Sequence, residues 1–276
     1  MDIELIASRL QASLLFTAEE MALPKTVRQP ASTEAELYES ANDAYEQMMG
    51  WLPSLGLEHY HQTAPFEPRI AYNVEGPILV TTPTKSAKRA REKVAADYNG
   101  DWSRLTDVVR ATVAVDMVAE LPDTVDALRQ SGMNLARRPK DRFANPMPNG
   151  YRDAHLNVVY GNGHIGELQI HVKPILRARE EMHGEYEKVR AIEARMKKGD
   201  REDFTAEEKE IFDDAEGTMA RKYAKAWADA GGGKTASMPC RAGMTDLNRA
   251  GELLACGKTK EKQNEQDSSR RAIHPA

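Results

Sequence analysis

Apolar side chains recur at helical spacing close to the start of the chain. Ile3, Ile6 and Leu10 follow one another at intervals of three or four residues, which is the spacing of one face of an α-helix. Pro24 cannot continue a helix. The pattern therefore predicts a helix over residues 2–23.

A second helix is predicted to begin at a capping box. Thr33 is followed three residues later by Glu36, a pair in which each side chain bonds the backbone N–H of the other at a helix start. The helix is expected to end near Trp51–Pro53. The two helices give a helical N-terminal region over residues 1–65, and neither carries a catalytic pattern.

The segment Glu58–His61 contains two histidines. Residues at i and i+2 share a face only in a strand, and no third metal ligand is evident beside them. A surface loop is therefore favoured over a metal site.

Apolar runs typical of β-strands occur in the middle of the chain, between helical patterns. The strand runs are Ile78–Val80, Leu105–Asp116, Met133–Ala136, His155–Tyr160 and Ile165–His171. Gly161–Gly163 joins the last two as a hairpin turn, because Asn and Gly tolerate positive φ. The helical patterns cover residues 84–98, Leu121–Gln130, Pro174–Arg195 and, after a capping box at Thr205 and Glu208, the segment that ends at Trp227.

The end of the chain is polar. Residues 231–276 cannot bury enough surface to fold alone and are predicted to form a disordered tail. The tail begins with Gly231–Thr235, which ends like a phosphate-binding loop. That loop needs a glycine where this chain has Ala228, and it follows a strand rather than a helix, so we reject it. Cys240 and Cys256 are too few for a disulfide framework or a zinc site and are expected to be reduced thiols.

The overall charge places limits on the function. The net charge is −5 over 276 residues, so the chain as a whole does not attract nucleic acid or polyphosphate, and any anion site must be local. No apolar run is long enough to cross a bilayer. The N-terminus carries acidic residues where a signal peptide needs basic ones. These features predict a globular protein in the cytoplasm.

Cations gather at the start of the helix predicted over residues 84–98. They are Lys85, Lys88, Arg89 and Arg91. A solvated helix face is the usual explanation for such a run. The helix dipole, however, favours cations at the opposite end of a helix. Their placement therefore indicates a bound anion at this helix start.

Four motifs follow one another between residues 138 and 171. They are the doublet Lys140–Asp141, the turn Pro146–Tyr151, the histidine His155 and the strand Glu167–Ile170. Their order and spacing resemble the synthetase domain of the RelA/SpoT family, the enzymes that make the alarmone (p)ppGpp. The resemblance covers about residues 80–200 and suggests a synthetase domain over residues 66–230.

The resemblance implies an α/β (α+β) fold of the nucleotidyltransferase type, with a mixed β-sheet flanked by helices and a helical N-terminal extension. It also implies transfer of a pyrophosphoryl group from ATP to the 3′-hydroxyl of an acceptor nucleotide, usually GDP or GTP. Mg²⁺ is the implied cofactor, because it binds carboxylate and phosphate oxygens and neutralises charge during phosphoryl transfer.

The resemblance also assigns roles to individual residues. Asp107 and Glu167 match the catalytic, magnesium-binding acids, and Glu167 matches the acid that orients or deprotonates the attacking hydroxyl. The ATP-binding cations are Lys85, Lys88, Arg89, Arg110, Lys140 and Arg142. The acceptor-binding residues are Tyr151, His155, Asn149 and Gln169. Tyr151 is expected to stand exposed on its turn and to stack on a purine base, whereas Asn149 alternatively serves only to form the turn.

Three positions depart from the family pattern. Thr112, Met147 and His171 stand where the family often has cations. Arg110 lies on the same strand face as Thr112 and is expected to substitute at the first position. The departures suggest an alternative, a degenerate synthetase fold that acts as a nucleotide-binding or interaction module. The two carboxylates speak against it, because a pure binder has no need of both.

The sequence lacks the His–Asp doublet that marks the hydrolase domain of the family. A synthetase without a hydrolase resembles the small alarmone synthetases and the toxic members of the family. The acceptor is then GDP or GTP, with an adenine nucleotide or the 3′ end of tRNA as alternatives. A toxic member implies an antitoxin or immunity protein as a partner.

Overall fold

The centre of the molecule is a mixed β-sheet. The computed structural model describes residues 15–62, 73–199, 201 and 203–233. The strands, in sheet order, are β1 (Glu58–His61), β2 (Ile78–Thr81), β3 (Arg110–Val115), β6 (Ile165–Val172), β5 (Ala154–Val159) and β4 (Lys140–Asp141). The pairs β1–β2 and β3–β6 are parallel, and the other neighbours are antiparallel. The predicted mixed sheet flanked by helices is confirmed.

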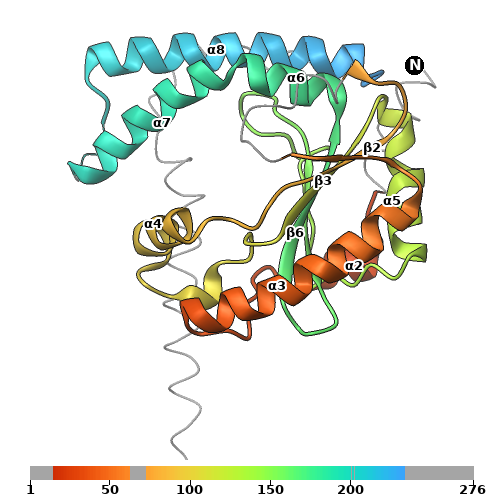
Figure 1. The fold of residues 1–276 in the computed structure, drawn as a ribbon. Helices are drawn as coiled ribbons and strands as arrows, with labels where there is room; N and C mark the ends of the chain where they lie inside the picture. Colours follow the sequence, from red (N-terminus) through yellow and green to blue (C-terminus); the bar gives the residue numbers. More distant parts are fainter. Residues whose placement is uncertain (1–14, 63–72, 200, 202, 234–276) are drawn as a thin grey trace, which may run out of the picture.

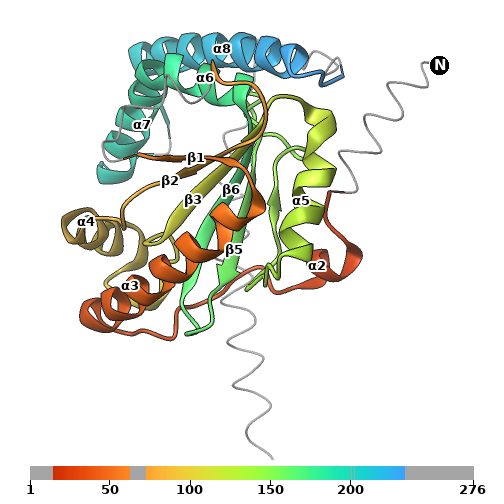
Figure 2. The same cartoon turned by 45° about the vertical axis from the view of Figure 1, so that its right-hand side comes forward.

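Helices cover both sides of this sheet. They are α2 (Ala18–Ala22), α3 (Glu34–Trp51), α4 (Ala87–Tyr98), α5 (Leu121–Gln130), α6 (Lys173–Glu181), α7 (His183–Lys198) and α8 (Ala206–Asp229), with short 3-10 turns at Leu52–Leu55, Trp102–Arg104 and Val118–Glu120. In Figures 1 and 2, α3 and α8 lie on opposite sides of the strands, and α6 and α7 accompany α8. In both views, helix α4 lies at the left of the strands and helix α5 at the right. No described helix combines the length and the apolar character needed to cross a membrane.

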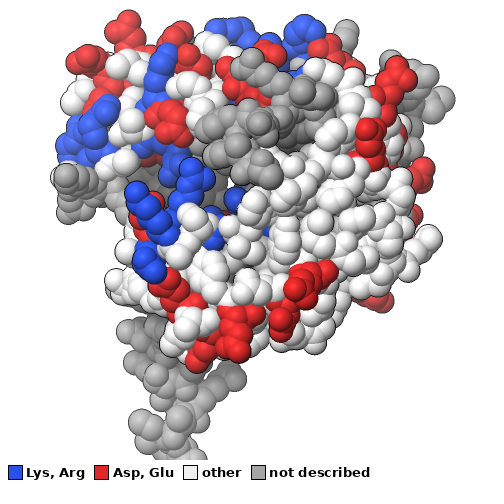
Figure 3. Space-filling model, viewed as in Figure 1, with Lys and Arg blue, Asp and Glu red and all other residues white. Residues whose placement is uncertain are grey.

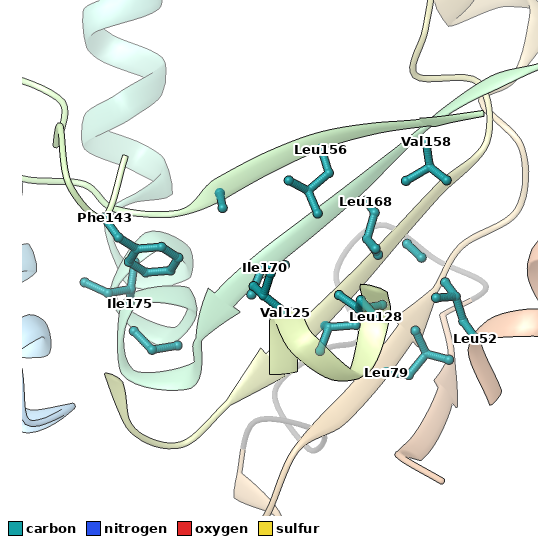
Figure 4. Close-up of a cluster of buried hydrophobic side chains, with 14 of the residues drawn as sticks. Leu52, Leu79, Val125, Leu128, Phe143, Leu156, Val158, Leu168, Ile170 and Ile175 are labelled. Atoms are coloured by element: carbon teal, nitrogen blue, oxygen red, sulfur yellow. The ribbon is translucent and has the colours of Figure 1, made fainter. Parts of the chain in front are cut away.

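The main hydrophobic core lies on one face of the sheet (Figure 4). Val113 of β3, Leu168 of β6 and Leu156 of β5 belong to one buried cluster with Leu37 of α3 and Val125 of α5. Neighbouring residues of a strand point to opposite faces. The residues between these apolar positions therefore point to the other face, where the polar side chains lie.

Capping chemistry fixes several of the helix ends that the sequence predicts. Thr33 and Thr205 each accept a hydrogen bond from the backbone of the glutamate three residues later, and both glutamates bond back. Both capping boxes are confirmed. Helix α4 begins later than expected, because Ser86 caps it by accepting a bond from the backbone N–H of Arg89. Lys85 consequently precedes the helix.

Two predictions about the N-terminal part need correction. Within the described part of the predicted helix over residues 2–23, only α2 is helical, because Thr17 is extended and starts a new capping box with Glu20. The first fourteen residues of the chain lie outside the described residues. Glu58–His61 is not a loop but the edge strand β1. Nε2 of His59 and Nδ1 of His61 both bond the hydroxyl of Thr81, at 2.9 and 3.0 Å.

Two further elements differ from the predictions. Met133–Ala136 makes only one isolated bridge, between Leu135 and Val158, instead of a strand; Gly132, with φ of +94°, turns the chain immediately before it. The helix predicted over Pro174–Arg195 is two helices. The N–H of Met182 bonds the carbonyls of both Ala178 and Glu180, which tightens the chain and ends α6.

The predicted domain boundaries remain predictions. The boundary near residue 65 and nearly all of the predicted tail, including Cys240 and Cys256, lie outside the described residues. The described residues do show that Leu37 and Met48 of α3 belong to the same buried cluster as the sheet. The chain before residue 65 thus supplies part of the main core.

Gly166 in β6 offers a test of the packing beside the polar face. A Cβ there would lie 2.8 Å from a ring carbon of Tyr160 and 3.0 Å from the carbonyl oxygen of Val109. We expect Gly166→Ala to lower the free energy of unfolding by about 1–3 kcal/mol, as overpacking does. The measurement is thermal and urea unfolding of the purified variant.

The matched control is Gly217→Ala. Gly217 lies inside α8, and its nearest contact is 3.5 Å away, at the flexible end of Arg221. Alanine there should stabilise the protein by up to about 1 kcal/mol. If Gly166→Ala unfolds at the wild-type urea concentration, the close approach of β6 to Val109 and Tyr160 is not tight in solution.

Candidate functional site

The polar face of the sheet carries two rows of side chains across its central strands. In the first row Arg110 of β3 pairs with Glu167 of β6, which pairs with Asn157 of β5. In the second row the paired residues are Thr112, Gln169, His155 and Lys140. Directly paired residues of neighbouring strands point to the same face. The topology therefore brings predicted ATP-binding, acceptor-binding and catalytic residues together.

Asp107 lies just before β3, between two lysines. Its Oδ2 is 2.9 Å from Nζ of Lys85 and 2.8 Å from Nζ of Lys93. Burial alone would raise the pKa of Asp107, but the two ammonium groups outweigh that effect and hold it below its ordinary value. The other oxygen, Oδ1, is buried without a hydrogen-bond partner among the described residues. Within the described residues, this oxygen therefore has unused hydrogen-bonding capacity.

Lys93 is a residue that sequence reasoning missed. Lys93 lies on α4. Burial would lower its pKa, but the negative charge of Asp107 outweighs burial, so the pKa of Lys93 is raised. The pKa of Lys85 is lowered, because burial dominates there. A signal for Lys93 does exist: it lies next to Val94 and three residues after Ala90, the two buried residues of α4, so it borders the buried stripe of that helix.

The other cations at the start of α4 have different environments. Lys88 and Arg89 are exposed. Arg91 does not join them, because its guanidinium forms three hydrogen bonds of 2.7–3.0 Å with the carboxylate of Glu34 on α3. Figure 3 shows Lys and Arg side chains gathered around a hollow in the face of the molecule beside α4. The predicted positive site is therefore made by fewer α4 residues than the sequence cluster suggests.

Glu167 occupies the centre of the polar face. Gln169 donates to its Oε1, and Nδ1 of His155 lies 3.6 Å from its Oε2. Arg110, in the next strand, has a buried Nε without a hydrogen-bond partner in the described part of the chain. Two predicted acceptor-binding residues thus contact or flank the predicted catalytic acid.

A second group of cations lies near Glu167, at and around β4. Partial burial, together with Arg137 and Arg142, lowers the pKa of Lys140. Arg137 donates to Oδ1 of Asn157, and burial lowers its pKa as well. Sequence reasoning missed Arg137 and Asn157. Asn157, in the predicted strand His155–Tyr160, stands two residues after His155, a spacing that places both on one face.

Asp153 is the most enclosed carboxylate of the site, with a side chain that is 0% exposed. It binds Nη1 of Arg142 at 2.7 Å and Nε2 of His155 at 2.7 Å, and it accepts a hydrogen bond from the Tyr151 hydroxyl at 3.0 Å. Sequence reasoning also missed this residue. Its position two residues before His155 is the signal that could have found it, because that spacing in an extended chain gives a common face.

Comparisons with known proteins agree with the motifs. The chain is 28% identical over 105 residues to the (p)ppApp synthetase toxin Tas1 of Pseudomonas aeruginosa, strain UCBPP-PA14. In sequence, the chain thus resembles pyrophosphokinases of the RelA/SpoT-like type. The matched segment is 38% of this chain and spans about a quarter of the relative, 23% of its length. No family model matches the sequence.

Several solved structures also match the chain, each at less than 20% identity and with a TM-score below 0.5. The complex between the Type VI effector Tas1 and its immunity protein matches with a TM-score of 0.44 and 19% identity, over 68% of this chain and 96% of that one. Small alarmone synthetase 2 from Bacillus subtilis gives 0.45 and 15%, over 70% and 96%. A GTP pyrophosphokinase family protein from Streptococcus pneumoniae gives 0.41 and 16%, over 70% and 93%.

One expectation drawn from the RelA/SpoT-like motifs is wrong in its geometry. Tyr151 is not exposed on its turn, because α8 covers the loop. Its ring centre lies 5.4 Å from that of Tyr223 and 6.2 Å from that of His171, and burial raises its pKa. The turn itself is present: Oδ1 of Asn149 accepts from the Tyr151 N–H at 3.2 Å, and Gly150 has φ of +80°. An exposed stacking platform at Tyr151 is therefore absent from the described arrangement.

Lys93 provides a test of the electrostatics around Asp107. Replacing Lys93 with methionine keeps most of the side-chain volume but removes one of the two cations, so the pKa of Asp107 should rise toward its ordinary value. Because Lys85 remains, we expect a loss of only about 1–2 kcal/mol of unfolding free energy at neutral pH. The carboxyl carbon of Asp107, followed by NMR during an acid titration, reports the pKa directly.

The pH dependence of stability has a definite sign here. A carboxylate whose folded pKa is lowered stabilises the protein above its unfolded pKa, and this contribution is lost as the pH falls through the folded pKa. The variant should therefore lose the Asp107 contribution at a higher pH than the wild type. Lys88→Met, on the exposed face of α4, is the control. An equal shift of the Asp107 titration in both variants would contradict the pairing.

Proposed function

We propose that the chain is a magnesium-dependent pyrophosphokinase that uses ATP as donor. The observation that carries the proposal is the position of two acids, Asp107 and Glu167, that lie beside cations and both interact electrostatically with Lys93. Asp107, at the start of β3, has a buried oxygen without a partner among the described residues. Glu167 of β6 pairs with Arg110 of β3. Similarity to a protein named as a (p)ppApp synthetase supports the same reaction type.

The donor phosphates fit the Asp107 side of the site. A triphosphate carries several negative charges, and positive groups stabilise the charge spread that develops in phosphoryl transfer. Lys85 and Lys93 are positioned by Asp107, while Lys88 and Arg89 stand exposed at the start of α4. We assign ATP binding to these residues together with Arg110, Lys140 and Arg142.

The described residues fit a magnesium ion that is completed by substrate. No group of three or more His, Cys, Asp or Glu in the described part of the chain is placed to hold a metal alone. Mg²⁺ commonly takes one or two carboxylates and fills its shell with waters and phosphates. Asp107 and Glu167 would hold it, since Lys93 interacts electrostatically with both. The ion would neutralise phosphate charge when bound.

Glu167 is assigned to the attacking hydroxyl. In the proposed reaction the 3′-oxygen of the acceptor forms a bond to the β-phosphorus of ATP, and its O–H bond breaks as the proton passes to the Glu167 region. AMP leaves with the electron pair of the broken P–O bond. Gln169 donates to one oxygen of Glu167, which leaves the other oxygen directed toward His155, 3.6 Å away.

The acceptor is a purine nucleotide in this proposal. The motifs point to GDP or GTP, whereas the similarity to a (p)ppApp synthetase points to an adenine nucleotide. We assign acceptor binding to His155 and Gln169, with Asn149 shaping the loop and Tyr151 bracing it from within. A toxin of this kind would need a neutralising partner, and the Tas1 complex with its immunity protein gives an example of one.

The test is AMP release from labelled ATP with Mg²⁺, run separately with ADP, ATP, GDP, GTP and tRNA as acceptor. Product identity follows from chromatography of the labelled nucleotide. We expect transfer to at least one purine nucleotide. If no acceptor yields AMP while ATP still binds, the chain is a nucleotide-binding module and the enzymatic proposal fails.

Glu167→Gln should abolish this transfer. An amide of the same shape retains the strand but neither accepts a proton nor binds Mg²⁺ well, so turnover should fall by at least about a hundredfold. Unchanged melting temperature would show that the fold is intact. Glu210→Gln, on the exposed face of α8, is the control and should retain wild-type turnover. AMP release by Glu167→Gln within a few-fold of wild type would remove Glu167 from this role.

A further inference from the structure

Lys85 is held by backbone hydrogen bonds on both sides of its Cα atom. Its N–H donates to the carbonyl of Val108 at 2.9 Å, and its own carbonyl accepts a hydrogen bond from the hydroxyl of Tyr38. Its side chain binds Oδ2 of Asp107 at 2.9 Å. Tyr38 lies on α3, before the segment that carries the RelA/SpoT-like motifs, and none of the roles assigned above involves it.

We propose that Tyr38 is a positioning residue that fixes the backbone of Lys85 and thereby directs the ammonium group of Lys85 toward the phosphates of the donor nucleotide. The proposal rests on the proposed function, because ATP binding is there assigned to Lys85. It deepens that assignment by giving the N-terminal helix α3 a part in donor binding.

The two backbone hydrogen bonds restrict both dihedral angles of Lys85. Each peptide group is planar, so the orientation of a residue is set by the two peptide planes that meet at its Cα. The N–H of Lys85 belongs to the plane before its Cα, and Val108 holds this plane against the segment that follows Asp107. The carbonyl belongs to the plane after the Cα, and Tyr38 holds that plane against α3. Together the two planes set the direction in which the side chain of Lys85 leaves the backbone.

Tyr38 reaches this carbonyl because α3 and α4 are tied together. Glu34 and Tyr38 are four residues apart on α3, a spacing that places them on the same face of the helix. The carboxylate of Glu34 accepts three hydrogen bonds of 2.7–3.0 Å from Arg91 of α4, and Figure 1 shows the beginning of α3 beside α4. The ring of Tyr38 packs against the main core, which limits the movement of its hydroxyl.

The hydroxyl of Tyr38 is the donor of this bond. The pKa of a tyrosine is ordinarily about 10, and partial burial raises the pKa of Tyr38 further, so the hydroxyl keeps its proton near pH 7. A carbonyl oxygen only accepts hydrogen bonds. Phenylalanine at position 38 would keep the ring in the core but would offer the carbonyl of Lys85 no proton.

A backbone fixed in this way favours donor binding. A lysine side chain is long and flexible, and ordering it against a ligand costs conformational entropy. The contacts with Val108, Tyr38 and Asp107 already restrict Lys85 before a nucleotide arrives. Less of the ordering cost then falls on the binding step. The loss of the Tyr38 hydroxyl should therefore weaken ATP binding more than it slows the chemical step.

Tyr38→Phe is the variant that tests the proposal in the full chain. We expect the KM for ATP to rise about three- to tenfold, the effect of one ordinary hydrogen bond. The kcat and the KM for the acceptor should stay within about twofold of wild type. The dissociation constant of a non-hydrolysable ATP analogue, measured by calorimetry with Mg²⁺, should rise by the same factor as the KM. A wild-type KM for ATP in this variant would overturn the proposal.

Tyr45→Phe is the matched control. Tyr45 lies about two helical turns farther along α3, is half-buried like Tyr38, and packs against the same core. Both variants lose a phenol oxygen from the same helix, so a general loosening of α3 predicts equal effects. We expect Tyr45→Phe to keep the KM for ATP within about twofold of wild type. Equal increases in the two variants would overturn the proposal. A fall of kcat, both substrate affinities and melting temperature together in Tyr38→Phe would also overturn it.

Hydrogen exchange measures the positioning of Lys85 without any catalysis. The amide of Lys85 is bonded to Val108, so it exchanges with deuterium when this segment opens locally. In Tyr38→Phe we expect its exchange, followed by NMR, to become at least about threefold faster, with no such change in Tyr45→Phe. Unchanged exchange of the Lys85 amide in Tyr38→Phe would overturn the proposal.

A double-mutant cycle tests whether Tyr38 acts through Lys85. In a Lys85→Met background, Tyr38→Phe should weaken binding of the ATP analogue by less than about twofold further, because the side chain that it positions is already absent. Multiplied losses would overturn the proposal. If the wild type releases no AMP with any acceptor, the proposed function fails, whereas exchange of the Lys85 amide still reports whether Tyr38 holds this backbone.

Discussion

The parallel pairing of β3 with β6 is the constraint on which the site depends. It sets Arg110 beside Glu167 and Thr112 beside Gln169. A slip of one residue in this register would turn the whole polar set of one strand toward the core. Val113 and Ile170, both fully buried, make such a slip costly, because they would then be exposed on the polar face. The apolar core thus holds the charged face in register.

The site also depends on local neutralisation of buried charge. An isolated carboxylate inside a protein is expensive, and such groups are paired or neutralised. Asp107 is matched by two lysines, and Asp153 by Arg142 and His155. Each pairing positions cations that the proposed reaction needs for phosphate. In the proposed reaction, the side chains that neutralise the acids would also bind the nucleotide.

Several parts of the fold could be predicted because the signal is local. The capping box at Thr33, the helix over Leu121–Gln130 and the Gly161–Gly163 turn each depend on residues that are neighbours in the sequence. The edge strand β1 was missed, because its polar residues show no apolar alternation and only the pairing with β2 makes it extended. The break at Met182 has no proline, and the nearby Gly184 lies inside α7, so neither residue type marks the break in the usual way.

In the candidate site, too, residues with a local sequence signal could be predicted, whereas residues placed by distant contacts could not. Glu167, Gln169 and His155 lie on strands that the sequence predicts, so their common face followed from the two-residue period. Tyr151 could not be placed from its loop, because the residue that covers it, Tyr223, is more than seventy positions later on α8. Lys93 was missed for a related reason: its partner Asp107 is close only after α4 has folded against the start of β3.

His171 shows what one departure from the family pattern does physically. A histidine that is fully buried, with a pKa lowered to about 3, carries no charge where a cation often stands. Its Nε2 lies 3.2 Å from Oε1 of Gln169, and Gln169 donates in turn to Glu167. The position thus acts on the acid through a neutral hydrogen-bonded chain rather than through charge. Arg137 and Lys140 both interact electrostatically with Glu167, so positive charge near this acid comes from residues at and just before β4.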